Sequence, residues 1–138
     1  RDVERSRGLG DVYKRQPITA SEALPPEQPI WLKPTDNLPD NPNLHLALLI
    51  YASDRTLLDT AWRPHANLGE HTGASLDHTV WVHNSTDFNQ WHLYTMKSPA
   101  SGSGRGLAFG GIHDEQGKRI LSTAQEGVMR TKTRRSTT

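Results

Sequence analysis

The hydrophobic pattern of the chain is strongest between residues 44 and 62. From Leu44 to Tyr51 the sequence is apolar nearly all round, which is typical of a buried helix rather than a surface helix. The apolar stripe continues at helical spacing through Ile50, Leu57, Leu58 and Trp62. We therefore predict one long helix, buried along much of its length.

The residues before this stripe carry helix-start signals. Asp40 or Asn41 can serve as N-cap, and Pro42 suits the first turn. A break near Ser53 is an open alternative, because a second helical segment could begin there with Asp54 as its own N-cap.

The other apolar segments are short and strand-like. A short extended segment, "PIWLKP" (29–34), precedes the helix, and four strand-like segments follow it. These are "ASLDHTVWVH" (74–83), "WHLYTMKS" (91–98), "GRGLAFGGIH" (104–113) and "LSTAQEGVMR" (121–130), with "DEQG" (114–117) as a hairpin turn. This order predicts an α+β fold in which one antiparallel sheet wraps around one long central helix.

The last predicted strand places an amide and a carboxylate side by side. Gln125 shares a face with Leu121 and Met129, whereas Glu126 shares the other face with Val128. Neither face is cleanly polar, and a strand that is apolar on both faces is usually covered on both. At least one of these two polar side chains should therefore have an internal partner. For Glu126, the plain expectation is a salt bridge to a basic residue on a neighbouring strand.

Composition and charge fit a single domain. The 138 residues are 33% hydrophobic, enough for one core but not two. Residues 1–16 lack periodicity and resemble a non-native or disordered segment, 17–28 a linker, 29–130 the domain and 131–138 a basic tail. Residues 1–16 hold five basic and three acidic residues, so the rest of the chain has 11 basic and 12 acidic residues. The net charge of +1 therefore says little about the domain.

Several classes of function are disfavoured. The middle of the chain has no basic concentration, so we expect no nucleic-acid binding. There is no cysteine, which excludes disulfides and thiolate zinc sites, and no apolar run long enough to span a membrane. We expect a soluble, cytoplasmic protein.

The most informative polar residue on the helix stripe is Asp54. It is either the N-cap noted above or a carboxylate held in an apolar wall, at least half buried against the sheet and suited to act as a general base. Ser75, Asp77 and Gln125 lie on strands that could flank such a helix, although solvated strand polar residues are the plainer explanation.

Other motifs are weak. His78 and His83, five residues apart in a predicted strand, point to opposite faces, so we expect no metal and no cofactor. The stretch "SPASGSGRG" (98–106) lacks the Gly-Lys-Ser/Thr ending of a phosphate-binding loop and fits a hairpin connection better. No Gly-x-Ser-x-Gly elbow occurs, which disfavours a serine hydrolase.

Three separated blocks carry a family resemblance. "NLHLALLIYASD", "ASLDHTVWVH" and "STAQEGVMR", together with "GSGRGLAFGGI", resemble the C-terminal half of the acyl-CoA thioesterase II family, the double-hotdog thioesterases. The resemblance runs from about Pro29 to Arg130 and implies a hotdog fold. It also implies hydrolysis of acyl-CoA thioesters by water that Asp54 activates, with Ser75 and Gln125 as the other catalytic residues. Serine is the less usual of the two hydroxyl residues that the family accepts at position 75.

The resemblance covers only one of the family's two hotdog halves. We therefore expect a truncated fragment that exposes an apolar sheet edge and pairs with another hotdog domain, either the missing N-terminal half or a second copy. Arg105 is a candidate for binding the CoA phosphates.

Two other functions remain open. One is a non-catalytic module that binds acyl-CoA or serves in assembly. The other is an acyl-CoA hydratase or dehydratase, whose similar members carry His five residues after the Asp; here Asp59 stands at that position.

Overall fold

The computed structural model describes residues 23–68 and 71–131, and it forms one helix and one sheet. The predicted segment 1–16, the first half of the predicted linker (17–22) and nearly all of the basic tail lie outside the described residues. In chain order the elements are β1 (Glu27–Leu32), α1 (Pro42–Trp62), the 3-10 helix η1 (Arg63–Leu68), β2 (His71–Ser75), β3 (Thr79–Val82), β4 (His92–Gly102), β5 (Arg105–His113) and β6 (Arg119–Thr131).

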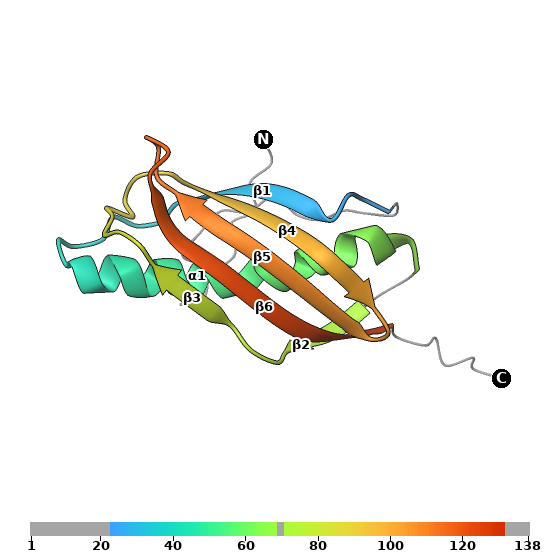
Figure 1. The fold of residues 1–138 in the computed structure, drawn as a ribbon. Coiled ribbons are helices and arrows are strands. Elements are labelled where there is room, and N and C mark those ends of the chain that lie inside the picture. Colours follow the sequence, from blue (N-terminus) through green and yellow to red (C-terminus); the bar gives the residue numbers. More distant parts are fainter. Residues whose placement is uncertain (1–22, 69–70, 132–138) are drawn as a thin grey trace.

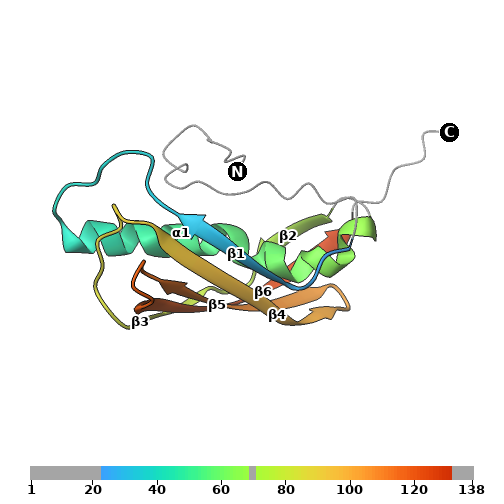
Figure 2. The same cartoon turned by 90° about the horizontal axis from the view of Figure 1, so that it is seen from above.

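The strands form a single six-stranded antiparallel sheet. Its order is β1-β4-β5-β6-β2, and β3 also pairs with β6, next to β2 along the same strand. Figure 1 shows α1 behind the sheet, and Figure 2 shows the sheet curving around one side of the helix. The predicted α+β architecture, with one antiparallel sheet wrapped around one central helix, is confirmed.

The helix α1 is continuous. Asn41 is its N-cap and accepts a hydrogen bond from the backbone N–H of Leu44 at 3.3 Å, and Pro42 opens the first turn, as predicted. The alternative break near Ser53 is wrong, because the helix runs through this residue without interruption. The Ser53 hydroxyl donates to the Ile50 carbonyl at 2.6 Å, within the same helix. Asp54 is therefore not an N-cap.

The core lies between α1 and the concave face of the sheet. Tyr94 of β4 is fully buried there, and its hydroxyl donates to the Ser53 carbonyl at 2.9 Å and lies 2.8 Å from the Thr123 hydroxyl. Burial raises the pKa of Tyr94 far above its ordinary value, so this hydroxyl keeps its proton. The other buried apolar residues of the core are Ile30, Leu32, Leu49, Ala52, Leu57, Phe88, Met96, Ala108, Ile112, Ile120 and Leu121.

A glycine on β6 sets how closely the helix approaches the sheet. A side chain at Gly127 would place its Cβ 2.4 Å from a methyl carbon of Leu58, closer than carbon atoms can approach. The absence of a side chain there brings the helix backbone within reach of polar groups on β6.

The segment 74–83 was predicted as one strand but forms parts of two. Ser75 pairs with Gly127 and Thr79 pairs with Ala124. The three residues 76–78 therefore lie opposite only two residues of β6, 125 and 126. In this gap the Leu76 N–H donates to the Glu126 carbonyl at 2.9 Å. An extra residue in one strand interrupts the ladder and bends that strand, as in a β-bulge.

The two predicted turns are confirmed. Gly117 closes the turn at 114–117 with φ +83°, and its N–H donates to the Asp114 carbonyl at 3.1 Å. The stretch 98–106 contains the hairpin of β4 and β5, whose connection is Ser103 and Gly104, with Gly104 at φ +78°. Both glycines adopt a left-handed conformation that other residues rarely accept.

The β2–β3 side of the sheet exposes large apolar side chains. Leu76, Trp81 and Val82 are each about half exposed. This matches the predicted apolar edge, since β2 and β3 both pair only with β6 among the described residues. Within the same residues, no helix is both long and apolar enough to cross a membrane.

Candidate functional site

Asp54, Ser75 and Gln125 lie together. The side-chain nitrogen of Gln125 donates to a carboxylate oxygen of Asp54 at 3.0 Å and also donates to the Ser75 hydroxyl. The three residues come from α1, the end of β2 and the middle of β6. The structure thus brings all three predicted site residues into direct hydrogen-bond contact.

Gln125 is the centre of this cluster. It pairs with Ala108 of β5 on the face of β6 that meets the helix, and it is only 1% exposed. Both hydrogens of its amide nitrogen are directed at protein groups, and its carbonyl oxygen faces a histidine ring. The prediction that one of the two polar residues in this strand has an internal partner is confirmed.

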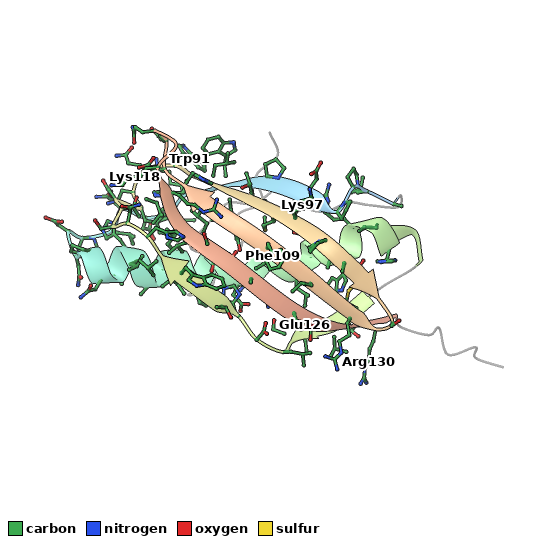
Figure 3. The ribbon with its side chains drawn as sticks, in the orientation of Figure 1. Trp91, Lys97, Phe109, Lys118, Glu126 and Arg130 are labelled. Carbon is green, nitrogen blue, oxygen red and sulfur yellow. The ribbon has the colours of Figure 1, made fainter. Side chains whose placement is uncertain are left out.

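Glu126 lies on the opposite face of β6, which Figure 3 shows turned away from the helix. Its carboxylate accepts a hydrogen bond from the Arg105 guanidinium of β5 at 2.9 Å. The expected salt bridge to a neighbouring strand is therefore present. Arg105, the candidate for the CoA phosphates, is on the outer face of the sheet, away from the Asp54 cluster, and its side chain is 61% exposed.

Asp54 is slightly less buried than predicted. Its side chain is 51% exposed, whereas at least half burial against the sheet was expected. The sheet ends beside it with β2 and β3, so the described residues provide no further strand to cover the carboxylate. The Asp54 carboxylate therefore contacts Gln125 through one oxygen and remains open to solvent on one side.

His78 also belongs to the cluster, although sequence reasoning considered it only as a metal ligand. Its Nδ1 lies 3.2 Å from the Gln125 carbonyl oxygen and 3.6 Å from an Asp54 oxygen. Its Nε2 lies 2.9 Å from the Ser53 hydroxyl. The adjacent polar residues Asp77 and His78, inside an otherwise strand-like segment, could have indicated a ladder break here, but not the direction of the ring.

Asp77, which was also placed near the site, has a different role. Its carboxylate accepts a hydrogen bond from the Glu126 backbone N–H at 2.8 Å, in the gap between β2 and β3. Asp77 therefore satisfies the backbone group that the interrupted ladder leaves open. It stabilises the bend that brings His78 towards Gln125.

One surface groove of the structure lies apart from this cluster. A groove of about 480 Å³ lies over β1, β4 and β5, and its lining residues include Gln28, Lys97 and Phe109 but none of the Asp54 cluster. Among the described residues, no group of three or more histidine, aspartate or glutamate side chains is arranged to hold a metal ion. The half-exposed Asp54 carboxylate makes the cluster accessible from solvent.

Comparison with known proteins gives consistent matches. The chain is 36% identical over 131 residues to acyl-CoA thioesterase 2 of Haemophilus influenzae, which covers 93% of this chain and 46% of that protein. It is 32% identical over 118 residues to human acyl-coenzyme A thioesterase 8, and this match covers 84% of this chain and 37% of that protein. The chain therefore spans less than half the length of these relatives.

A solved structure has the same fold. The acyl-CoA thioesterase II TesB2 of Mycobacterium marinum matches with a TM-score of 0.74 and 31% identity, over 96% of this chain and 57% of that one. This likeness confirms the predicted hotdog fold. The acyl-CoA thioesterase family profile matches residues 12–128, including residues 12–16 of the segment predicted to be non-native. The chain belongs to the acyl-CoA thioesterase family.

Proposed function

We propose that the Asp54 cluster hydrolyses acyl-CoA thioesters to a free fatty acid and coenzyme A. The observation that carries this proposal is the pair of hydrogen bonds from Gln125 to Asp54 and Ser75. A carboxylate, a hydroxyl and a carboxamide from three separate elements meet on the accessible side of the helix. Such a group can orient one water molecule and remove its proton.

In the proposed reaction, Asp54 acts as general base. It takes a proton from water, and the resulting hydroxide attacks the thioester carbonyl carbon. The carbon–sulfur bond then breaks, and the electron pair leaves with the sulfur of coenzyme A, a good leaving group. Ser75 accepts a hydrogen bond from Gln125, so its own hydrogen is available to the water or to the carbonyl oxygen. Gln125 fixes the other two groups relative to each other.

We further propose that the site works next to a second hotdog domain. The exposed apolar residues Leu76, Trp81 and Val82 lie along the β2–β3 side, beside a half-exposed Asp54. A partner on this side would cover the apolar residues and supply the other wall of an acyl groove. The partner is either the family's N-terminal half or a second copy of this chain.

Release of free thiol from octanoyl-CoA and palmitoyl-CoA, followed with a thiol reagent, tests the proposed activity. Gel filtration of the same sample tests the pairing. We expect a dimer that releases thiol. A dimer that binds acyl-CoA without hydrolysis would contradict the proposed activity and support the non-catalytic module. A well-behaved monomer would contradict self-association.

Direct attack by Asp54 on the thioester is the competing route. It would form an anhydride, whose hydrolysis leaves an oxygen atom from solvent in the Asp54 carboxylate. A single turnover in heavy-oxygen water followed by mass spectrometry of the Asp54 peptide distinguishes the two routes. General-base catalysis predicts label in the fatty acid alone.

A further inference from the structure

His78 lies in the cluster because the strand bends. It is the last of the three residues, 76–78, that separate β2 from β3, and its side chain is 17% exposed. Hydrogen bonds between this segment and Glu126 hold the bend in place, through the Leu76 N–H and the Asp77 carboxylate. The ring is thereby placed between α1 and β6, in contact with Ser53 and Gln125.

The contacts of Ser53 determine whether one ring nitrogen of His78, Nε2, carries a hydrogen. The Ser53 hydroxyl has a single hydrogen, which it donates to the Ile50 carbonyl at 2.6 Å. Towards His78 the same oxygen can therefore only accept. The Nε2 atom of His78, 2.9 Å away, must carry a hydrogen and donate it.

The contacts of Gln125 determine whether the other ring nitrogen of His78, Nδ1, carries a hydrogen. Because its amide nitrogen donates to the Asp54 carboxylate and to Ser75, its carbonyl oxygen is the atom that faces His78. A carbonyl oxygen only accepts, so Nδ1 of His78 must also donate across the 3.2 Å contact. Rotating the amide would instead set its oxygen against a carboxylate oxygen of Asp54.

Both ring nitrogens are thus donors, which requires the imidazolium form of His78. The charge is balanced by Asp54, whose oxygen lies 3.6 Å from Nδ1. Two more titratable groups lie close by: Asp77 in the same bend, whose carboxylate accepts from the Glu126 N–H, and Tyr94 of β4, which keeps its proton and donates to the Ser53 carbonyl. With no free lone pair, His78 cannot take a proton from water in this arrangement.

We propose that His78 is a positioning residue, which holds the Gln125 carboxamide so that its nitrogen faces Asp54 and Ser75. The consequence for hydrolysis rests on the proposed function, whereas the protonation of the ring does not. The same geometry excludes a histidine base oriented by Asp54, because Nε2 points at the buried Ser53 and not at the accessible side.

Two substitutions separate the roles of the ring nitrogens. His78→Asn keeps a neutral donor near the position of Nδ1, towards Gln125. His78→Gln keeps a donor near the position of Nε2, towards Ser53, and loses the one towards Gln125. The two variants are close in polarity and size, so each serves as the folding control for the other.

Thiol release in the full chain should distinguish them. We expect His78→Gln to lower kcat by about 10- to 100-fold, as loss of an outer-shell partner does at other catalytic centres, and His78→Asn to lower it clearly less. KM should change little in both, because the ring is not placed to touch the substrate. Equal kcat values for the two variants would overturn the proposal.

A second measurement does not depend on activity. Two-bond nitrogen–proton NMR correlations of the His78 ring report whether each ring nitrogen carries a hydrogen. At neutral pH we expect both to be protonated in the unmodified chain, and one to lose its hydrogen in Asp54→Asn. An unprotonated ring nitrogen in the unmodified chain would overturn the proposal even if hydrolysis is observed. If both ring nitrogens of His78 carry a hydrogen but the chain does not hydrolyse acyl-CoA, the result would support the positioning role of His78 and contradict only the proposed function.

Discussion

Two buried glutamines approach the same helix from different strands, and they have different surroundings. Gln28 of β1 is 7% exposed and Gln125 of β6 is 1% exposed. Each amide nitrogen donates to a residue of α1, Thr60 for Gln28 at 3.0 Å and Asp54 for Gln125 at 3.0 Å. By residue type and burial alone, the two positions would be judged equivalent.

The partners of the two glutamines differ in chemistry. Gln28 contacts the hydroxyl of Thr60 and the carbonyl of Thr56, and its own oxygen accepts from Arg63 at 3.3 Å. This group ties β1 to the helix and contains no carboxylate. Gln125 instead contacts a carboxylate that is half exposed.

The difference shows what distinguishes a candidate site from a structural network. Buried amides need partners in both places, because an unsatisfied polar group in the interior is costly. Of the two networks, only the one around Gln125 includes a carboxylate, and solvent reaches about half of that side chain. The side chains around a buried glutamine, rather than its burial, therefore indicate its role.

The largest effect should come from removing the carboxylate. Asp54→Asn keeps the size of the side chain but cannot accept a proton, so we expect kcat for acyl-CoA hydrolysis to fall by about 100- to 10,000-fold. Asp59→Asn, on the same helix, is the control and should retain activity. Full activity in Asp54→Asn would refute both the general-base and the nucleophile route.

Exchanging each glutamine for leucine tests the comparison directly. Gln125→Leu removes the link between Asp54 and Ser75, so we expect kcat to fall by about 100-fold, as a misplaced catalytic group does. Gln28→Leu should leave kcat nearly unchanged. Both should lower the free energy of unfolding by about 1–3 kcal/mol, because each leaves buried partners without a hydrogen bond.

Urea denaturation and thiol release on the same preparations measure these two effects. Comparable losses of kcat in the two leucine variants would show that the two glutamines do not differ in role. Comparable losses of stability with different kcat values are the expected result.

A smaller effect is expected at Tyr94, which supports the helix beneath the site. Tyr94→Phe removes the hydrogen bond to the Ser53 carbonyl and the contact with Thr123. We expect a loss of about 1 kcal/mol in the free energy of unfolding, measured by urea denaturation. Because the hydroxyl does not contact the Asp54 carboxylate, kcat should fall much less than in Gln125→Leu. A loss of kcat as large as that of Gln125→Leu would place Tyr94 in the site itself.

The smallest effect is expected at the outer ion pair. If Arg105 binds a CoA phosphate, Arg105→Gln should raise KM by about fivefold, equivalent to about 1 kcal/mol for an exposed contact between charges. Glu126→Gln breaks the same 2.9 Å ion pair but keeps the cation, so it should not raise KM. Equal KM values in both variants would remove Arg105 from the substrate-binding residues.

The sequence by itself determined the helix and the class of fold. A continuous apolar stripe and a cap at Asn41 specify a buried helix, and alternating segments with glycine turns specify an antiparallel sheet around it. These features depend on local spacing, which a single sequence shows directly. The helix stripe singled out Asp54, but only the family resemblance joined it to Ser75 and Gln125, since Gln125 and Asp54 are 71 residues apart and no local pattern links them.

Only the tertiary structure decided how the cluster is assembled. The division of 74–83 into β2 and β3, the rotation of His78 towards Gln125 and the exposure of Asp54 all follow from pairing against β6. The hydrophobic pattern of a strand does not reveal a bulge. A bulge exists only relative to the partner strand, and here the three residues 76–78 lie opposite the two residues 125–126. The orientation of polar groups at this site is therefore a property of contacts between distant segments.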